Sequence, residues 1–287
     1  MADNPTNSPV SVNVDLTKPI TIFIEKIASA TGVLYEPTRI KKKAAAEAEA
    51  KMLQIKNEIR MTQLQRRAMQ RLVNEEAKKQ FNIESVISEA LPQIKSDAHP
   101  EEIDDDWLAN FFERAKFVSD SEMRAIWARL LAGEANAPKS FSRRTINLVA
   151  ELEKGDAELF GRIADYVWLI NEQKPLVFDV TDSIYTSNGL DFSTLTHLDS
   201  LGLITFQPFT GFRVFRQGQK GGTFLLSYAG KGYRVKVPIG MDAEIQTGKV
   251  MFTQQGKELY TICSPKEVEG LVDYVLEKIR SSGLEVR

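Results

Sequence analysis

The stretch from Pro37 to Gln80 constrains this chain most, because it reads as one very long helix. It has no glycine and no proline after its first residue, and most of it is built from the strongest helix formers. Pro37 suits the first turn of a helix, where its missing N–H costs no hydrogen bond. Helical throughout, the stretch would extend for roughly 65 Å, far beyond a typical globular helix. So long and polar a helix must pack against a partner over part of its length.

Only a weak apolar stripe follows this predicted rod. It shifts to another face partway along, and it contains no strict heptad repeat, so a regular coiled coil is not expected. We expect copies of the chain to associate along the stripe and form a homo-oligomer. The interface residues predicted from the stripe are Met52, Ile55, Ile59, Leu64 and Leu72.

Two neighbouring blocks of the chain carry opposite charge, although the net charge is only −2. Residues 41–80 hold eleven basic and five acidic side chains, and residues 97–134 hold ten acidic and four basic ones. The acidic block includes Asp104–Asp106, which suit the start of a helix. Either the two blocks dock on each other, within or between subunits, or both are solvated surface.

The pattern predicts a mainly α fold with a C-terminal α+β part. Helical periodicity dominates up to about residue 170, and shorter alternating segments with glycine-rich turns follow. The predicted organisation is a disordered tail over 1–18, an amphipathic helix and the rod over 19–96, a compact helical domain over 97–174, and a winged-helix-like α+β domain over 175–287.

The helical domain has clear punctuation. Ser119 and Glu122 predict a capping box at the start of one helix, and Gly133 predicts its end. Asp156 predicts the start of a last helix that reaches Ile170. The core residues predicted for this domain are Trp107, Phe111, Trp127, Leu130 and Leu131.

In the C-terminal part, a helix is expected over 192–201 and a closing helix over 265–282. Strands are expected over 176–180, 204–206, 212–215, 223–228, 233–237, 250–253 and 261–262.

The segment LTHLDSLGLI, from Leu195 to Ile204, has the form of a winged-helix recognition helix that leads into a wing strand, and a later T-x-x-G-x-E-L element often ends such domains. Duplex binding draws its affinity mainly from Lys and Arg contacts to phosphate. Residues 191–201 contain Asp191, Asp199 and His197 but no Lys or Arg, which favours protein–protein contact or structural support. A basic wing is the alternative, and its nucleic-acid contacts would be Arg213, Arg216, Lys220, Lys231, Arg234 and Lys236.

No set of residues specifies a reaction, a metal or a cofactor, and we do not expect an enzyme. Cys263 lies in an apolar run and is expected to be a small core residue. The N-terminus lacks an apolar signal segment and no run is long enough to span a membrane, which indicates a cytoplasmic protein. The amphipathic segment 19–34 has two readings: it packs under the rod, or it lies peripherally in the inner face of the membrane.

Several phrases resemble a family of uncharacterised bacterial proteins that contain a domain of unknown function. They are LYEPTRIKKKAAAEAEA, RRAMQRLVNEEAKKQFNIESV, VSDSEMRAIWARLLAGEANAPKSFSRRT and EKGDAELF, and the resemblance covers about residues 20–170. The first part is also similar to the abortive-infection alpha proteins of bacteria. The resemblance implies a bacterial or phage-related origin and a role in defence against phage, and it supplies no catalytic residues.

The sequence therefore predicts a non-enzymatic, self-associating scaffold or sensor with unidentified protein partners. The alternative is a nucleic-acid-binding regulatory protein that uses the winged-helix-like module.

Overall fold

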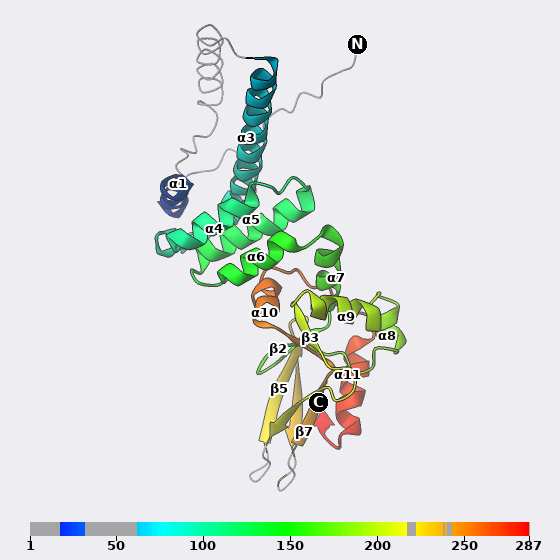
Figure 1. The fold of residues 1–287 in the computed structure, drawn as a ribbon. Helices are drawn as coiled ribbons and strands as arrows, with labels where there is room; N and C mark the ends of the chain where they lie inside the picture. Colours follow the sequence, from blue (N-terminus) through cyan, green and yellow to red (C-terminus); the bar gives the residue numbers. More distant parts are fainter. Residues whose placement is uncertain (1–17, 32–61, 217–221, 238, 240–242, 287) are drawn as a thin grey trace. The chain divides into compact units, whose positions relative to one another are not determined.

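The computed structural model describes residues 18–31, 62–216, 222–237, 239 and 243–286 (Figure 1). The chain forms two compact units, Met1–Arg143 and Arg144–Arg287, and each is described by itself. Helices are combined with antiparallel sheets, which confirms the mixture of a helical part and an α+β part. Within the described ranges, no helix is long and apolar enough to cross a membrane.

The boundary at Arg143 differs from the predicted helical domain over 97–174. The helix that follows the boundary bonds to unit 2, because the hydroxyl of Thr145 donates to the Glu258 carboxylate at 2.5 Å. Thr145 is fully buried. This hydrogen bond lies within unit 2, which contains the chain after residue 143.

Unit 1 is helical in its described parts. Helix α3 packs on α4 and α5, and α1 packs on α4 and η2. Helix α1 buries Ile20, Phe23 and Ile27, and Lys26 on the same helix pairs with Asp105 at 2.6 Å. The elements are α1 (Lys18–Thr31), α3 (Gln63–Ala90), η1 (Leu91–Gln93), η2 (Pro100–Glu102), α4 (Asp105–Ala115) and α5 (Ser121–Asn136).

A helix that is continuous from Pro37 to Gln80 is not what the structure shows. Thr62 has an extended backbone, with φ −64° and ψ 159°, and its hydroxyl accepts the N–H of Gln65. The Gln65 side chain accepts the N–H of Thr62 in return, so a capping box begins α3. The helix then runs past Gln80 to Ala90. The rest of the predicted rod, residues 37–61, lies outside the described residues.

The predicted aromatic core of unit 1 is confirmed. Trp107, Phe111 and Trp127 are buried. The ring centroid of Phe111 lies 5.1 Å from that of Trp107 and 5.0 Å from that of Trp127. Leu130 and Leu131 are fully buried beside them in α5. The indole N–H of Trp107 donates to a backbone carbonyl at 2.7 Å, so its one polar group is satisfied.

The predicted ends of helix α5 are wrong by a few residues. Its N-cap is Asp120, whose carboxylate accepts the N–H groups of Glu122 and Met123, rather than Ser119. The helix also continues through Gly133 to Asn136. Serine and aspartate are about equally good N-cap residues, so the adjacent Asp120 can replace Ser119 as the cap at little cost.

Unit 2 is built around one antiparallel five-stranded sheet, with strand order β2-β1-β5-β6-β9, and two strand pairs, β3–β8 and β4–β7. Its helices are α6 (Arg143–Glu151), α7 (Lys154–Ala164), α8 (Ser183–Thr186), α9 (Phe192–Ser200), α10 (Gln254–Tyr260) and α11 (Leu271–Ser281). Its strands are β1 (Val167–Ile170), β2 (Glu172–Pro175), β3 (Ile204–Phe206), β4 (Phe212–Arg216), β5 (Gly222–Tyr228), β6 (Lys231–Val237), β7 (Ala243–Gly248), β8 (Val250–Phe252) and β9 (Glu285–Val286).

The region around Asn171 differs from the prediction. The helix α7 ends at Ala164 instead of Ile170, and its N-cap is Glu153 rather than Asp156. Asn171 has φ 62°, a conformation that asparagine tolerates, and it turns β1 directly back into β2. The strand that was predicted over 176–180 forms earlier in the chain, as β2 over Glu172–Pro175.

The closing helix begins later than predicted. Gly270, in the left-handed conformation with φ 75°, precedes α11, so residues 265–270 lie outside the helix. This segment bonds to other parts of unit 2: Lys266 N–H donates to Asp165, and Val268 N–H donates to the Tyr228 hydroxyl. The strand predicted over 261–262 is a turn.

The T-x-x-G-x-E-L element, residues 253–259, links α10 to neighbouring elements, and we call it the clasp. The Thr253 hydroxyl caps α10 and also donates to the Gly202 carbonyl at the end of α9, at 2.7 Å. Gly256 lies so close to the chain that a Cβ there would be 2.0 Å from the carbonyl oxygen of Leu203. Glu258 accepts the Thr145 hydroxyl. The element therefore ties α10 to the end of α9 and to α6.

We predict that Gly256→Ala lowers the free energy of unfolding by at least about 1–3 kcal/mol, because a methyl group would displace the Leu203 carbonyl. The matched control is Gly161→Ala in helix α7, where a Cβ meets nothing within 4 Å. That substitution should stabilise the protein by about 0.5–1 kcal/mol. Urea denaturation measures the free energy of unfolding of both variants. Equal changes for the two substitutions would contradict the close packing of Gly256 against Leu203.

Candidate functional site

Helix α9 presents a surface of small polar side chains. Asp191 caps it by accepting the N–H of Thr194 at 2.8 Å, and Leu195 and Leu198 are buried. The exposed positions include Thr196, whose hydroxyl donates to a carbonyl one turn back in the same helix. This surface has hydroxyl groups and carboxylates but no Lys or Arg, which is a poor match for the phosphates of a duplex.

His197, the one base-reading candidate on α9, is held by a carboxylate. Its Nε2 lies 2.6 Å from Asp156 Oδ1 on α7. Burial raises the pKa of Asp156, but hydrogen bonds from His197 and from the backbone N–H of Glu153 outweigh it, and the net pKa lies below the ordinary value. The pair joins α9 to α7, so the arrangement is a structural contact between two helices.

Aromatic side chains lie beside α9, from its first residue, Phe192, to the strand that follows the helix. The ring of Phe192 packs edge-on against Phe206 at 5.4 Å, and the backbone N–H of Phe206 donates to the Asp199 carboxylate at 3.0 Å. Phe209 follows in the next turn and is 96% exposed. We call Asp191, Phe192, Asp199, Phe206 and Phe209 the aromatic patch. The sequence analysis did not predict this patch. The one signal for it was an aromatic residue in the turn sequence QPFTG, residues 207–211.

The six predicted nucleic-acid contacts do not gather on one strand pair. Arg213 is exposed on β4, in the β4–β7 pair, while three of the others lie on β6 of the five-stranded sheet. On β6, Lys231 pairs with Glu267 at 2.8 Å and Lys236 with Glu285 at 3.8 Å. Arg234 is exposed on β6. Nothing is described of the Arg216 side chain, and Lys220 lies outside the described residues.

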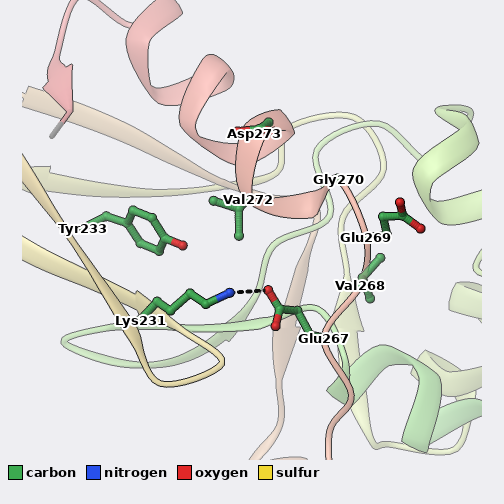
Figure 2. Close-up of a pocket in the computed structure, with 8 residues that line it drawn as sticks. All are labelled: Lys231, Tyr233, Glu267, Val268, Glu269, Gly270, Val272 and Asp273. Carbon is green, nitrogen blue, oxygen red and sulfur yellow. Dashed lines mark hydrogen bonds and ion pairs between the residues drawn. The ribbon is translucent and has the colours of Figure 1, made fainter.

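Unit 2 has an open hollow of about 520 Å³ beside the start of α11 (Figure 2). Figure 2 shows Glu267 directed at Lys231, whereas Glu269 and Asp273 lie apart from that ion pair. The other lining residues are Tyr233, Val268, Gly270 and Val272. Its polar groups do not converge on one point, as they do in a ligand site.

A small charge network joins β2 to α10. Glu172 lies 2.5 Å from the ammonium of Lys174 and 2.6 Å from that of Lys257. These hydrogen bonds lower the pKa of Glu172 to about 2, so the carboxylate stays charged at neutral pH. Lys174 is buried, and the network satisfies its charge rather than forming a reactive site.

The described residues contain no cluster of three or more His, Cys, Asp or Glu side chains that could hold a metal ion. Cys263 is half-buried, and its Sγ lies 3.5 Å from the carbonyl oxygen of Leu259. The thiol therefore contacts the C-terminal end of α10.

Among the described residues of unit 1, the N-terminal part of α3 is the longest continuously exposed stretch. Every residue from 63 to 78 is exposed, and we call this range the exposed segment. Among its large apolar side chains, Leu64 is 69% and Leu72 is 53% exposed. These two belong to the predicted interface, whose other members, Met52, Ile55 and Ile59, lie outside the described residues.

The acidic residues predicted to face the rod are engaged within unit 1. Asp104 caps α4 through the N–H of Trp107 at 2.8 Å. Asp105 pairs with Lys26, and Asp106 lies 3.7 Å from Arg143. The structure therefore accounts for this cluster by helix capping and local ion pairs.

Comparison with curated proteins and with solved structures gives no match. A family model described as a protein of unknown function (DUF2806) matches residues 66–276, from α3 to α11. Because this match covers most of both compact units, the chain belongs to the DUF2806 family of proteins of unknown function.

Proposed function

We propose that this DUF2806 protein is a non-enzymatic, self-associating scaffold or sensor, and that the exposed segment of α3 is the surface through which copies associate. The observation that carries the proposal is the exposure of every residue from 63 to 78. The first buried residue of α3 is Asn82, more than five turns into the helix.

Physical chemistry supports a partner for this segment. Helices in proteins are stabilised mainly by packing of an apolar face rather than by helix propensity. The exposed segment has apolar side chains to pack, because Met69 and Val73 lie exposed beside Leu72. A second copy of the chain would bury them.

The resemblance to bacterial abortive-infection alpha proteins supports a role in defence against phage, in which assembly would accompany the response. A cytoplasmic protein fits this role. Peripheral membrane contact through α1 is less well supported, because Ile20, Phe23 and Ile27 are already buried in unit 1.

We predict that Leu72→Glu weakens self-association at least about tenfold, because burial of a leucine contributes roughly 1.5–3 kcal/mol. The matched control is Asn74→Glu, which adds the same charge about 200° around the helix. Light scattering over a range of protein concentrations measures the mass of each variant. Equal masses for Leu72→Glu and the wild type, at concentrations where the wild type is oligomeric, would exclude this face.

The second candidate is nucleic-acid binding by unit 2. It is favoured by the exposed Arg213 and Arg234 on the strands that follow α9. We expect no sub-micromolar binding of duplex DNA by the full chain at physiological salt, because α9 offers no cation.

Fluorescence anisotropy at several salt concentrations tests this expectation. Tight, salt-dependent binding would support the second candidate instead. Replacing Arg213 and Arg234 by Ala should then reduce the salt slope by about two.

A further inference from the structure

The aromatic patch of unit 2 and the exposed segment of α3 have complementary charges. The charged members of the patch are both aspartates, and the nearest basic residues along the turn that carries Phe209 are Lys249 and Arg213. Asp191 and Asp199 are exposed within the patch itself. The exposed segment holds four basic side chains and two acidic ones, so it is net positive.

The patch also presents an exposed aromatic side chain, Phe209, on a hydrogen-bonded turn. Phe209 lies in a turn closed by hydrogen bonds from the Gly211 N–H to the Gln207 carbonyl and from the Thr210 hydroxyl to the Gln207 side chain. The Gln207 N–H donates to the Lys249 carbonyl at 2.8 Å and holds the turn against the neighbouring chain. These bonds fix the backbone of the turn, so less backbone entropy is lost on binding, and exposed aromatic side chains dominate many interfaces.

We infer that the exposed segment of α3 in one copy docks on the aromatic patch of a second copy. This inference rests on the proposed function and names the surface that receives α3. Leu72 and its apolar neighbours would cover Phe209 and Phe192, and Arg66, Arg67 and Arg71 would face Asp191 and Asp199.

The charges favour this pairing over symmetric packing of two α3 helices. Two exposed segments would bring like net charges together, which costs free energy at an interface. Docking of α3 on a different surface of the next molecule is a heterologous contact, which extends into a ring or an open chain of copies.

A complementation experiment tests the inference with two full-length variants. Leu72→Glu removes a competent α3 but keeps the patch, and Phe209→Ala removes the anchor but keeps α3. Both positions are exposed, so neither change disturbs the core. Each variant alone should associate at least about tenfold more weakly than the wild type.

When the two variants are mixed, the α3 of one can use the patch of the other. The mixture should form a species of two chains and stop there, because each molecule retains one competent surface. Leu225→Ala, which changes a 59% exposed side chain outside the patch, should behave like the wild type.

Light scattering distinguishes the outcomes. Wild-type-like assembly of Phe209→Ala would overturn the inference and leave self-association through α3 intact. Two weakened variants whose mixture stays monomeric would also overturn it. A wild-type protein that is monomeric at every concentration would instead contradict the proposed function itself.

Discussion

Among the described residues, helix α3 is buried only toward its C-terminal end, and the proposed role of the protein depends on that asymmetry. From Asn82 onward the helix is packed in unit 1, where Val86, Ile87 and Ala90 are buried. Over residues 63–78 it has polar and apolar side chains exposed on all sides. Because the backbone hydrogen bonds continue along one helix, the anchored end fixes the direction in which the exposed segment leaves the core. Among the described residues, no element covers the exposed segment.

In unit 2, the described surface of α9 is a poor match for phosphate groups, because it carries no Lys or Arg. Its α9 surface is neutral or acidic, and His197 is occupied by Asp156. The T-x-x-G-x-E-L clasp gives that helix a firm base, since Thr253 and Gly256 fix α10 against the chain that follows α9. The proposed docking of a basic, apolar protein segment on this surface relies on its exposed Asp191, Asp199, Phe192 and Phe209.

The sequence predicted those parts of the fold in which periodicity and burial agree. The core of Trp107, Phe111 and Trp127 was identified because its residues recur at helical spacing. Prediction failed at positions where two local solutions are similar in energy. Ser119 and Asp120 are both good caps, and the apolar Val167–Ile170 continues the helical spacing of α7 although it forms β1. The turn at Asn171, with positive φ, decided that case and leaves little signal in a single sequence.

The candidate surfaces were only partly predictable for similar reasons. Leu64 and Leu72 were identified from the stripe, because exposed apolar residues on a polar helix stand out. Phe209 was not, because a lone aromatic residue in a turn looks like a core residue until its 96% exposure is known. The basic residues of the strands were taken as one wing, but their distribution over two separate sheets depends on long-range strand pairing.

Hydrogen exchange of the backbone amides in the exposed segment tests the central claim most directly. The wild-type protein would be compared at low and high concentration, with the buried helix α4 as an internal reference. If α3 is covered by another copy, exchange over residues 63–78 should slow as the concentration rises, while α4 stays unchanged. Exchange that is fast in this segment and independent of concentration would contradict the account.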